Sequence, residues 1–518
     1  MPDRFCLDEF YRIPNNNLLN YISYNQNYHL NDVIKILLPL YFDRLKPVID
    51  YLLNGGKETR PKLFLITLRA IYDYKVSENG DFVANLREHS NPDVSQRSNL
   101  ESFLSKVDIN SLSTKSIASN DDKSKTVDKI AYSESLEKYK CLLKSNFKQD
   151  IISEFKNKIL YLIVADCIEI IQGALVILDD IMDDSKIRRG KQCWHILEGL
   201  KVVHDAEMLI SLIYLLLRFV YSHFKYIYLN KKNIIGDKKS DSQDDESTLI
   251  SGLASNSPEM MEDFDFDYYK AIKKFNQTFL KTAMGQTQDA LEKTVRKWDD
   301  AERFYTRENY EKICVAKNSF YTFALPIDLG FLLSNMFLTM NNNNNVFFDL
   351  NTCQKLKTKN YNSERNIGND SLDSSANVYK LTTKTIDEFL LKHAKFYQFS
   401  FESKFLCFSL LLMGIYHQIK DDYLNFFPSI SGKSETDLEE RKLTFFTYQI
   451  VEKGFDQNVL DFLMMKTDES YVKGLILPLL KEFEENEINF VNDILKCKDG
   501  FFDVLVDICV AILYKRKN

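Results

Sequence analysis

The feature that most constrains the fold is a series of stretches in which apolar residues recur every three or four positions. This spacing puts the apolar side chains on one face of an α-helix, and several stretches are long enough to be core helices. The stretches are residues 30–53, 61–74, 151–184, 202–228, 264–291, 301–337, 379–424 and 441–515. With 16 Gly and 10 Pro in 518 residues, tight turns are few, which disfavours Gly-rich nucleotide-binding sheets and β-sandwiches. We therefore predict an all-α fold, a single bundle of about ten helices around a central cavity.

Three polar tracts interrupt these stretches, at about residues 76–145, 229–263 and 340–377. They are rich in Asn, Ser, Asp and Lys, and they have too few apolar residues at helical spacing to bury a face. We expect long disordered insertions, and a role as recruitment sites for partners is the alternative. Length alone predicts three or four domains at about 150 residues each. Without the tracts, the sequence instead predicts one domain that spans residues 1–518.

Composition and charge limit the compartment and the partners. Nine cysteines without a CxxC pair favour a reducing compartment over a disulfide framework or a zinc site. A net charge of −7 disfavours nucleic acid as the main partner. The longest apolar stretch, residues 405–416, is shorter than the roughly 18 residues that cross a bilayer, and the N-terminus resembles neither a signal nor a transit peptide. We therefore expect a cytoplasmic protein with no transmembrane segment.

The segment 169–195 carries an acidic motif followed by two arginines. Asp179 and Asp183 are four residues apart, so both carboxylates project from one face of a helix. Because they follow the apolar run 168–178, they come at the end of a buried helix and need a cation, for which Mg²⁺ is suited. Arg188 and Arg189 can grip a diphosphate in bidentate fashion beside that metal. A solvated acidic face is the alternative.

Two further motifs carry charge at helix ends. Asp421 and Asp422 end the apolar helix that contains residues 405–415, with Gln418 one turn earlier. Two acidic helix ends predict facing walls of one cavity that holds several metal ions. Near the start, GGKETRP at 55–61 supplies Lys57 and Arg60 just before a helix, and an ordinary glycine turn with surface charges is the alternative.

These three motifs, in this order, resemble those of the trans-polyprenyl diphosphate synthases, the family of farnesyl and geranylgeranyl diphosphate synthases. GGKETRP is similar to the family's GGKxxR element, LDDIMDDSKIRRG to its first aspartate-rich motif and HQIKDDYLN to its second. Lys317, Lys433, Lys442 and the basic C-terminus at 514–517 also match. The resemblance covers the periodic stretches and skips the polar tracts, so it accounts for the tracts as loop expansions.

The resemblance implies an isoprenoid-synthase fold and a prenyltransferase activity. The implied reaction is the Mg²⁺-dependent head-to-tail (1'-4) condensation of isopentenyl diphosphate with dimethylallyl, geranyl or farnesyl diphosphate, which gives farnesyl and geranylgeranyl diphosphate. It also implies a homodimer and about three Mg²⁺ ions per active site. Cations would stabilise the departing diphosphate, and a dry apolar pocket would shelter the allylic cation until the double bond of isopentenyl diphosphate attacks it.

The family's functional residues transfer to this chain position by position. The implied metal-binding residues are Asp179, Asp180, Asp183, Asp421 and Asp422. The catalytic residues and contacts of the allylic diphosphate are Arg188, Lys317 and Gln418, joined by Asn318, Lys433 and Lys442. The contacts of isopentenyl diphosphate are Lys57, Arg60, Gln172 and Arg189.

The second motif departs from the family at Asn425, where a third Asp is usual. Asn318 stands where a Thr commonly follows the lysine, and Glu435 replaces a glycine in the Lys433 loop. Because Asp421 is the expected direct ligand, we predict at most a weaker metal affinity from Asn425.

Ala174 and Leu175 precede Asp179 by about 6 to 7.5 Å along a helix, and the resemblance places them at the floor of the tunnel that receives the growing chain. Bulky aromatic residues there stop eukaryotic relatives at farnesyl diphosphate. Ala174 leaves the floor open, which predicts geranylgeranyl diphosphate as a product. A tight helix contact at Ala174 is the alternative.

Two other functions remain open. A terpene cyclase shares the fold and the first acidic motif, but it would need neither GGKETRP nor the pair Arg188 and Arg189. A non-catalytic regulatory subunit of a prenyl synthase would be expected to lose aspartates from one motif, and here both pairs are present.

Overall fold

The periodic stretches make up most of the structure, which is a computed structural model. The described residues are 29–53, 58–76, 138, 141, 151–153, 157–188, 190–237, 258–291, 297–341, 383–401, 403–427, 437–454, 456–495 and 503–514. Most of each predicted insertion lies outside them, so the prediction of disorder in those tracts stays a prediction. The predicted site residues Lys57, Arg189 and Lys433, and Glu435 beside them, also lie outside the described residues.

Almost every element in the described part is a helix. The exception is a small hairpin, β1 (Ile187–Arg188) and β2 (Lys191–Gln192), whose strands pair antiparallel. The helices are α3 (Leu30–Leu37), α4 (Phe42–Leu53), α5 (Thr59–Val76), α9 (Lys158–Met182), α10 (Trp194–Glu198), the 3-10 helix η2 (Gly199–Lys201), α11 (Val202–Asp237), α12 (Pro258–Leu291), α13 (Trp298–Phe304), α14 (Arg307–Cys314), the π-helix η3 (Val315–Ala324), α15 (Leu325–Asn341), α17 (Thr383–Ala394), α18 (Lys404–Asn425), α20 (Phe445–Glu452), α21 (Gln457–Leu463), α22 (Ser470–Leu495) and α23 (Asp503–Tyr514). The predicted all-α fold class is confirmed.

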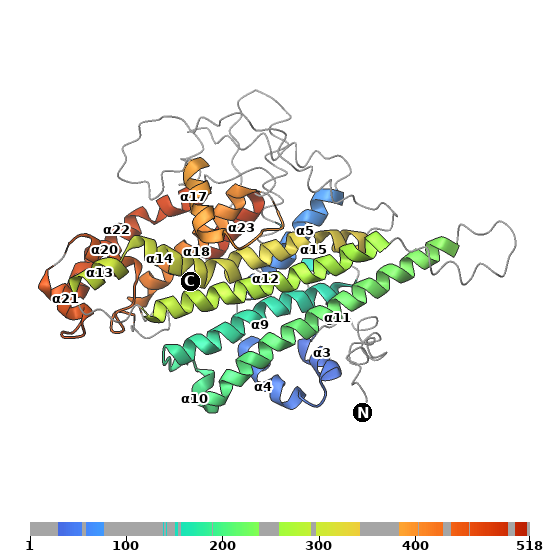
Figure 1. The fold of residues 1–518 in the computed structure, drawn as a ribbon, viewed down its shortest axis with the longest axis horizontal. Coiled ribbons are helices and arrows are strands. Elements are labelled where there is room, and N and C mark those ends of the chain that lie inside the picture. The colour runs from blue at the N-terminus through green and yellow to red at the C-terminus, as the bar shows by residue number, and fades with distance from the viewer. Residues whose placement is uncertain are drawn as a thin grey trace, which may run out of the picture.

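Helix α9 is the central helix of the bundle. It packs against α4, α5, α11 and α12, and α9, α11 and α12 run side by side (Figure 1). Every residue from 159 to 174 is buried, as expected for a helix that is apolar on all sides. By length and composition α9 could also cross a membrane, but most of it is buried inside the protein, and core helices share this composition.

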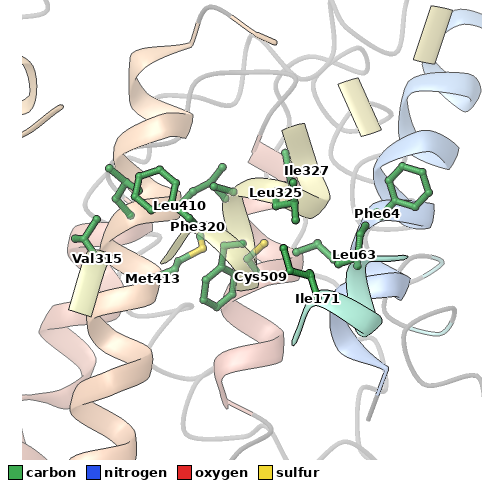
Figure 2. Packing of buried hydrophobic residues seen from close by; sticks show 14 of the residues in the cluster. Leu63, Phe64, Ile171, Val315, Phe320, Leu325, Ile327, Leu410, Met413 and Cys509 are labelled. Carbon is green, nitrogen blue, oxygen red and sulfur yellow. The ribbon is translucent and has the colours of Figure 1, made fainter. Parts of the chain in front are cut away.

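A second group of helices packs around η3. Phe320 of η3, Leu410 and Met413 of α18, Leu325 of α15 and Cys509 of α23 are all fully buried (Figure 2). Each large apolar side chain buried in this way stabilises the fold by about 1.5–3 kcal/mol. The packing brings the C-terminal end of α18 and the N-terminal part of η3 to the same region as the end of α9.

The structure corrects the bounds of two sequence predictions. Helix α11 continues to Asp237 and α12 begins at Pro258, so both ends of the predicted insertion 229–263 are helical. A helix that is already nucleated extends at little cost through Lys, Glu and Met, even where no apolar face is buried. The predicted stretch 379–424 is divided into α17 and α18, since residues 395–401 and 403 are not helical.

Candidate active site

The first acidic motif lies where the buried helix α9 ends. Asp180 is buried, whereas the side chains of Asp179 and Asp183 are 20% and 14% exposed. The amide of Asp183 donates a hydrogen bond to the carbonyl of Asp179 at 2.9 Å. One helical turn therefore separates the two carboxylates, as the spacing predicts.

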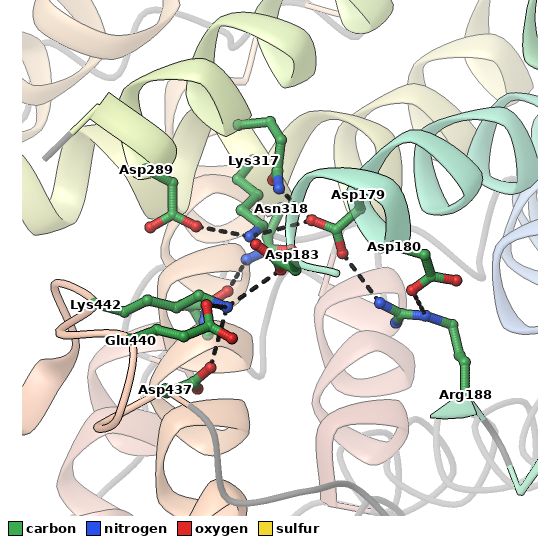
Figure 3. Close-up of polar contacts among 12 residues, drawn as sticks. Asp179, Asp180, Asp183, Arg188, Asp289, Lys317, Asn318, Asp437, Glu440 and Lys442 are labelled. Carbon is green, nitrogen blue, oxygen red and sulfur yellow. Dashed lines mark hydrogen bonds and ion pairs between the residues drawn. The ribbon is translucent and has the colours of Figure 1, made fainter. Parts of the chain in front are cut away.

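Arg188 binds two carboxylates of this motif at once (Figure 3). Its Nη2 lies 3.1 Å from Oδ2 of Asp179, and its Nε lies 2.5 Å from Oδ1 of Asp180. Burial lowers the pKa of Arg188, but the charges of Asp179 and Asp180 outweigh that effect and raise the pKa above its ordinary value. The guanidinium is thus held beside the acidic motif as a permanent cation.

The hairpin that carries Arg188 is held in place by helix α4. The hydroxyl of Tyr51 donates a hydrogen bond to the carbonyl of Gln192 at 3.0 Å. The ring of Tyr51 also contacts that of Trp194, with 4.9 Å between centroids. Trp194 Nε1 donates in turn to Asp205 Oδ2 at 2.8 Å. These contacts explain how a two-residue strand outside the core can orient a functional side chain.

Two lysines from distant parts of the chain add positive charge beside this motif. Lys317 Nζ lies 2.8 Å from Asp289 Oδ2 and 3.5 Å from Asp179 Oδ1. Lys442 Nζ lies 3.1 Å from Asp183 Oδ2. Burial lowers the pKa of Lys317, but Asp289, Asp179 and Asp183 outweigh it and raise that pKa well above its usual range. Burial also lowers the pKa of Lys442, but Asp437 and Asp183 outweigh it and raise that pKa above its usual range, so both lysines are charged.

The carboxylate of Asp183 is still only partly compensated. Burial raises its pKa, and the charge of Asp179 raises it further, while Lys442 and Lys317 act in the opposite direction. The net pKa of Asp183 lies above its usual value. A further cation between Asp179 and Asp183 would remove this penalty.

The π-helix η3 places Lys317 and Asn318 between two other helices. A Cβ added at Gly285 of α12 would lie only 2.7 Å from the amide nitrogen of Lys317, and one at Gly414 of α18 only 2.5 Å from Cα of Ser319. The two glycines therefore permit both helices to approach η3 at backbone distance. Single π-turns inside helices are common at functional sites.

Two residues of α12 belong to the site although the sequence analysis did not identify them. Gln286 Nε2 donates a hydrogen bond to Asp179 Oδ1, and Asp289 pairs with Lys317. The available signal was the segment GQTQD at 285–289, because a glycine inside a helical pattern indicates close packing or function. Asp437 and Glu440, which contact Lys442 at 3.3 and 3.2 Å, were also missed.

The second acidic motif has a different environment. Oδ2 of Asp422 accepts hydrogen bonds from the hydroxyl of Tyr310 at 2.7 Å and from the amide of Phe445 at 2.8 Å, and Oδ1 accepts one from Gln418 at 2.7 Å. Burial raises the pKa of Asp422 to about 7, and the charge of Asp437 adds to the shift. The Asp422 carboxylate thus links α18 to α14 and α20. The metal-binding role that the resemblance implied for it stays a prediction.

Gln418 and Asp421, which belong to the same motif, are less buried than Asp422. The amide of Asn318 donates a hydrogen bond to Oε1 of Gln418, which joins η3 to the second motif. Asp421 is 24% exposed, and its Oδ2 lies 4.0 Å from Nδ1 of His417. The structure therefore connects both motifs through the adjacent residues Lys317 and Asn318.

The predicted contacts of isopentenyl diphosphate are described at two positions, Arg60 and Gln172. Arg60 Nη2 donates to Oγ1 of Thr322 at 3.1 Å, and its guanidinium lies 4.6 Å from the ring centre of Tyr321. Within the described part of the chain, the buried Nε of Arg60 and the buried Oε1 of Gln172 have no hydrogen-bond partner. Buried polar atoms of this kind are costly unless a ligand or water satisfies them.

The donor set fits Mg²⁺ in the manner typical of phosphate-binding enzymes. Among the described residues no three His, Cys, Asp or Glu side chains could hold a metal ion by themselves. Mg²⁺ is commonly held by one or two carboxylates together with waters and substrate phosphates, without a cage made of protein alone. Asp179 and Asp183, one turn apart and partly exposed, supply such a pair.

The two predicted chain-length positions lie on the buried part of α9. Ala174 is fully buried, and Leu175 is partly buried against the core. The role of these two residues at a tunnel floor stays a prediction.

Comparisons with known proteins point to one family. The model of the polyprenyl synthetase family matches residues 145–241 and 402–475. The farnesyl pyrophosphate synthase of Rattus norvegicus is 25% identical over 300 residues, which are 57% of this chain and 56% of the relative. The human farnesyl pyrophosphate synthase is 24% identical over 293 residues, 56% of this chain and 45% of the relative. The chain thus spans about half the length of these curated relatives.

Two other comparisons extend further along the chain. A probable farnesyl diphosphate synthase of Dictyostelium discoideum is 22% identical over 352 residues, 64% of this chain and 69% of the relative. A solved structure of Trypanosoma brucei farnesyl diphosphate synthase with a bisphosphonate aligns with 99% of this chain and 96% of that chain, at 16% identity and a TM-score of 0.43. The two family-model segments contain both acidic motifs.

Proposed function

Since this chain belongs to the polyprenyl synthetase family, we propose that it is an Mg²⁺-dependent prenyltransferase of the farnesyl and geranylgeranyl diphosphate synthase type. The proposed reaction condenses isopentenyl diphosphate with dimethylallyl, geranyl or farnesyl diphosphate in a head-to-tail (1'-4) fashion. The observation that carries the proposal is the network at the end of α9. There Asp179 and Asp183 are paired with Arg188, Lys317 and Lys442, which come from three separate parts of the chain.

This network has the composition of a diphosphate site. The three cations bind carboxylates in the structure, and the same groups can turn to the oxygens of a diphosphate when one enters. When bound, Mg²⁺ supplies positive charge that offsets both the carboxylates and the leaving group. Arg188 offers a planar fork for two oxygens, whereas Lys317 and Lys442 supply point charges.

The chemistry then follows from charge separation. The bond between C1 of the allylic substrate and its diphosphate oxygen breaks, and Arg188, Lys317 and Lys442 stabilise the negative charge that develops on the leaving group. The double bond of isopentenyl diphosphate supplies the electron pair for the new carbon–carbon bond. The proton that this carbon skeleton then loses passes to the released diphosphate.

Arg60 and Gln172 are the described candidates for holding isopentenyl diphosphate. The buried Nε of Arg60 is a donor without a partner among the described residues, and a diphosphate oxygen would satisfy it. The stacking of Arg60 on Tyr321 of η3 fixes the guanidinium on the same element that carries Lys317. The cations proposed to hold the two substrates, Arg60 of α5 and Lys317 of η3, would therefore both lie at the same π-helix.

An assay with isopentenyl diphosphate, each allylic diphosphate and Mg²⁺ tests the proposal. Mass spectrometry should detect farnesyl and geranylgeranyl diphosphate. Cyclised hydrocarbons would support the terpene-cyclase alternative, and no turnover would support a regulatory subunit. Lys317→Ala should lower kcat/KM by about 100-fold or more. The matched control, Lys312→Ala, removes a half-exposed lysine that pairs with Glu308, and its activity should stay at the wild-type level.

The product length is tested at Ala174. If this residue floors the tunnel, Ala174→Phe should shift the products from geranylgeranyl towards farnesyl diphosphate because the aromatic ring blocks further growth. An unchanged product distribution would exclude that role. Leu175→Phe, at the neighbouring position, tests which side of α9 faces the chain.

We propose a cytoplasmic homodimer. The described cysteines 141, 167, 193, 314, 407 and 509 are free thiols, which suits a reducing compartment. Leu280 and Met284, one turn apart on α12, are 60% and 62% exposed, and an apolar pair of this kind on a long helix suits a subunit contact. Leu280→Glu with Met284→Glu should convert a dimer to a monomer in light scattering, and an unchanged mass would place the contact elsewhere.

A further inference from the structure

Residues 437–442 form a turn that carries Lys442 to the first acidic motif. The amide of Arg441 donates to the carbonyl of Leu438 at 3.1 Å, and the amide of Lys442 donates to that of Asp437 at 3.0 Å. Arg441 has a φ of 54°, in the left-handed region that residues other than glycine rarely adopt. A non-glycine residue keeps such a conformation only when its surroundings enforce it.

The side chain of Arg441 holds the turn in this conformation through three hydrogen bonds. Its Nε donates to the carbonyl of Phe462 at 3.1 Å, its Nη2 to that of Thr467 at 2.9 Å, and its Nη1 to that of Glu439. The guanidinium also lies 4.7 Å from the ring centre of Phe462. One side chain therefore ties the turn to the C-terminal part of α21 and to the segment that precedes α22.

The backbone on both sides of this side chain is also fixed. The hydroxyl of Tyr305 donates to the carbonyl of Arg441 at 2.5 Å. Thr447, in the capping box of α20, donates to the carbonyl of Lys442 at 3.0 Å. The Cα of Lys442 is thus held between two anchored carbonyls, which leaves its side chain to reach the site.

The reach of Lys442 depends on this anchoring. Its Nζ contacts three carboxylates (Figure 3), at 3.1 Å from Asp183, 3.2 Å from Glu440 and 3.3 Å from Asp437. The side chain is only 12% exposed. Asp437 and Glu440 belong to the turn itself, whereas Asp183 ends α9. Lys442 therefore joins the turn to the acidic motif.

We propose that Arg441 is a positioning residue, which holds the turn 437–442 in its strained conformation so that Lys442 is in place before the allylic diphosphate binds. The inference rests on the proposed function, because it assigns the purpose of the turn to diphosphate binding. Lysine cannot replace Arg441, since three carbonyls in different directions need the guanidinium fork. Glycine would adopt the backbone conformation without strain but would make none of the side-chain bonds.

A double-mutant cycle with Lys442 tests the inference in the full-length protein. Arg441→Gly and Arg441→Lys should each raise KM for the allylic diphosphate at least fivefold and leave KM for isopentenyl diphosphate within twofold. In the background of Lys442→Ala, Arg441→Gly should add less than a twofold change, because the residue it positions is already missing. Additive effects of the two changes would overturn the proposal.

Two further variants serve as a second test and as a control. Tyr305→Phe keeps the ring and removes the hydroxyl that donates to the Arg441 carbonyl, and it should raise the same KM by a smaller factor than Arg441→Gly. It also tests the turn if Arg441→Gly does not fold. Arg303→Lys, on α13 at the same end of the molecule, removes a guanidinium that lies over Phe304, and both KM values should be unchanged. A rise with Arg303→Lys equal to that with Arg441→Lys would indicate a general effect of lost arginines and overturn the proposal.

A binding measurement distinguishes a failure of this inference from a failure of the proposed function. Calorimetry with Mg²⁺ and inorganic diphosphate measures whether Arg441→Gly and Lys442→Ala weaken binding to the same extent, and the double variant no further. If the wild-type chain binds diphosphate in this pattern but does not condense the substrates, the proposed function fails and the role of Arg441 stands. If the chain condenses the substrates but the two changes act additively, the role of Arg441 fails and the function stands. A wild-type chain that neither condenses nor binds overturns both.

Discussion

The two acidic helix ends differ in what surrounds their aspartates. At the end of α9, Asp179 and Asp183 are partly exposed and are bound by Arg188, Lys317 and Lys442. At the end of α18, Asp422 is buried and is bound by neutral donors, which are a tyrosine hydroxyl, a backbone amide and a glutamine amide. Two helix ends that each carry an Asp-Asp pair therefore give their aspartates different partners.

The difference separates exchangeable interactions from structural ones. A lysine or arginine at the end of a long side chain can move from a carboxylate to a phosphate with little change in the backbone. A backbone amide cannot leave Asp422 without shifting the start of α20. The α9 end is therefore suited to binding and release, and the buried carboxylate of α18 to holding Gln418 and the neighbouring helices in place.

The largest effect is expected from Asp179→Ala. This change removes an expected metal ligand that faces Arg188, Lys317 and Gln286, so kcat/KM should fall by about 100- to 1,000-fold. The free energy of unfolding should fall less than in Asp422→Ala, because Arg188 and Lys317 keep a second carboxylate, Asp180 and Asp289, and because the change removes the repulsion between Asp179 and Asp183. Steady-state kinetics and urea unfolding measure the two quantities.

A neighbouring acid provides the control for this prediction. Asp184 is 79% exposed and pairs with Lys186, which is 62% exposed. Asp184→Ala removes one negative charge next to the motif, and it should leave kcat/KM within about threefold of the wild type. Both losses in Asp179→Ala can be expressed as free energies, one from unfolding and one from kcat/KM. A loss of unfolding free energy as large as the loss from kcat/KM would show that the two acidic ends do not differ in kind.

Asp422→Ala should produce the opposite pattern. It leaves the hydroxyl of Tyr310, the amide of Phe445 and the amide of Gln418 without their acceptor, and each unsatisfied buried donor costs about 1–3 kcal/mol. The free energy of unfolding should therefore fall by at least about 2 kcal/mol, and activity should fall less than in Asp179→Ala.

Tyr310→Phe sharpens this second prediction. It removes one donor and leaves the carboxylate, so its loss of stability should be about 1 kcal/mol. Urea unfolding of both variants gives the ratio of the two losses. Full stability in Asp422→Ala, with activity lost, would show that Asp422 acts as a metal ligand after all.

The sequence was sufficient to predict the acidic motif of α9 because its partners are either local or charged. Asp179 and Asp183 share a helix face by spacing alone, and Arg188 follows within the same segment. The all-α fold followed in the same way from helical periodicity. In contrast, the partners of Asp422 are distant in the sequence, Tyr310 on α14 and Phe445 on α20, and one of them is a backbone group that any residue would provide.

The other missed residues have related causes. Asp289 and Gln286 stand on a helix with polar residues on several sides, so their spacing does not distinguish a site from a solvated face. Asp437 and Glu440 belong to a short acidic turn, and only the tertiary structure brings Lys442 between them. The helical ends of the second tract were missed because helix extension from a folded core needs no apolar face.

A smaller effect is expected on the unfolding free energy that the protein gains when a ligand binds. This measurement compares the two acidic helix ends in one experiment. Mg²⁺ with inorganic diphosphate should stabilise the wild-type chain by about 2.7 kcal/mol at a ligand concentration 100 times Kd. Asp179→Ala should lose most of this protection. Asp422→Ala should retain it, although it unfolds at a lower temperature. Thermal unfolding with and without the ligand gives both values, and protection lost equally in the two variants would contradict the distinction.

The smallest effect is expected at Asn425, the last residue of α18. Asn425→Asp restores the acid that related synthases usually have, but the position is only 7% exposed, so burial opposes the new charge. Any gain in metal binding is therefore offset in part. Activity should stay within about threefold of the wild type, with an equal or lower Mg²⁺ requirement, because Asp421 is unchanged and burial opposes the added charge. A magnesium titration of kcat measures this, and a complete loss of turnover would mean that Asp421 is not the direct ligand.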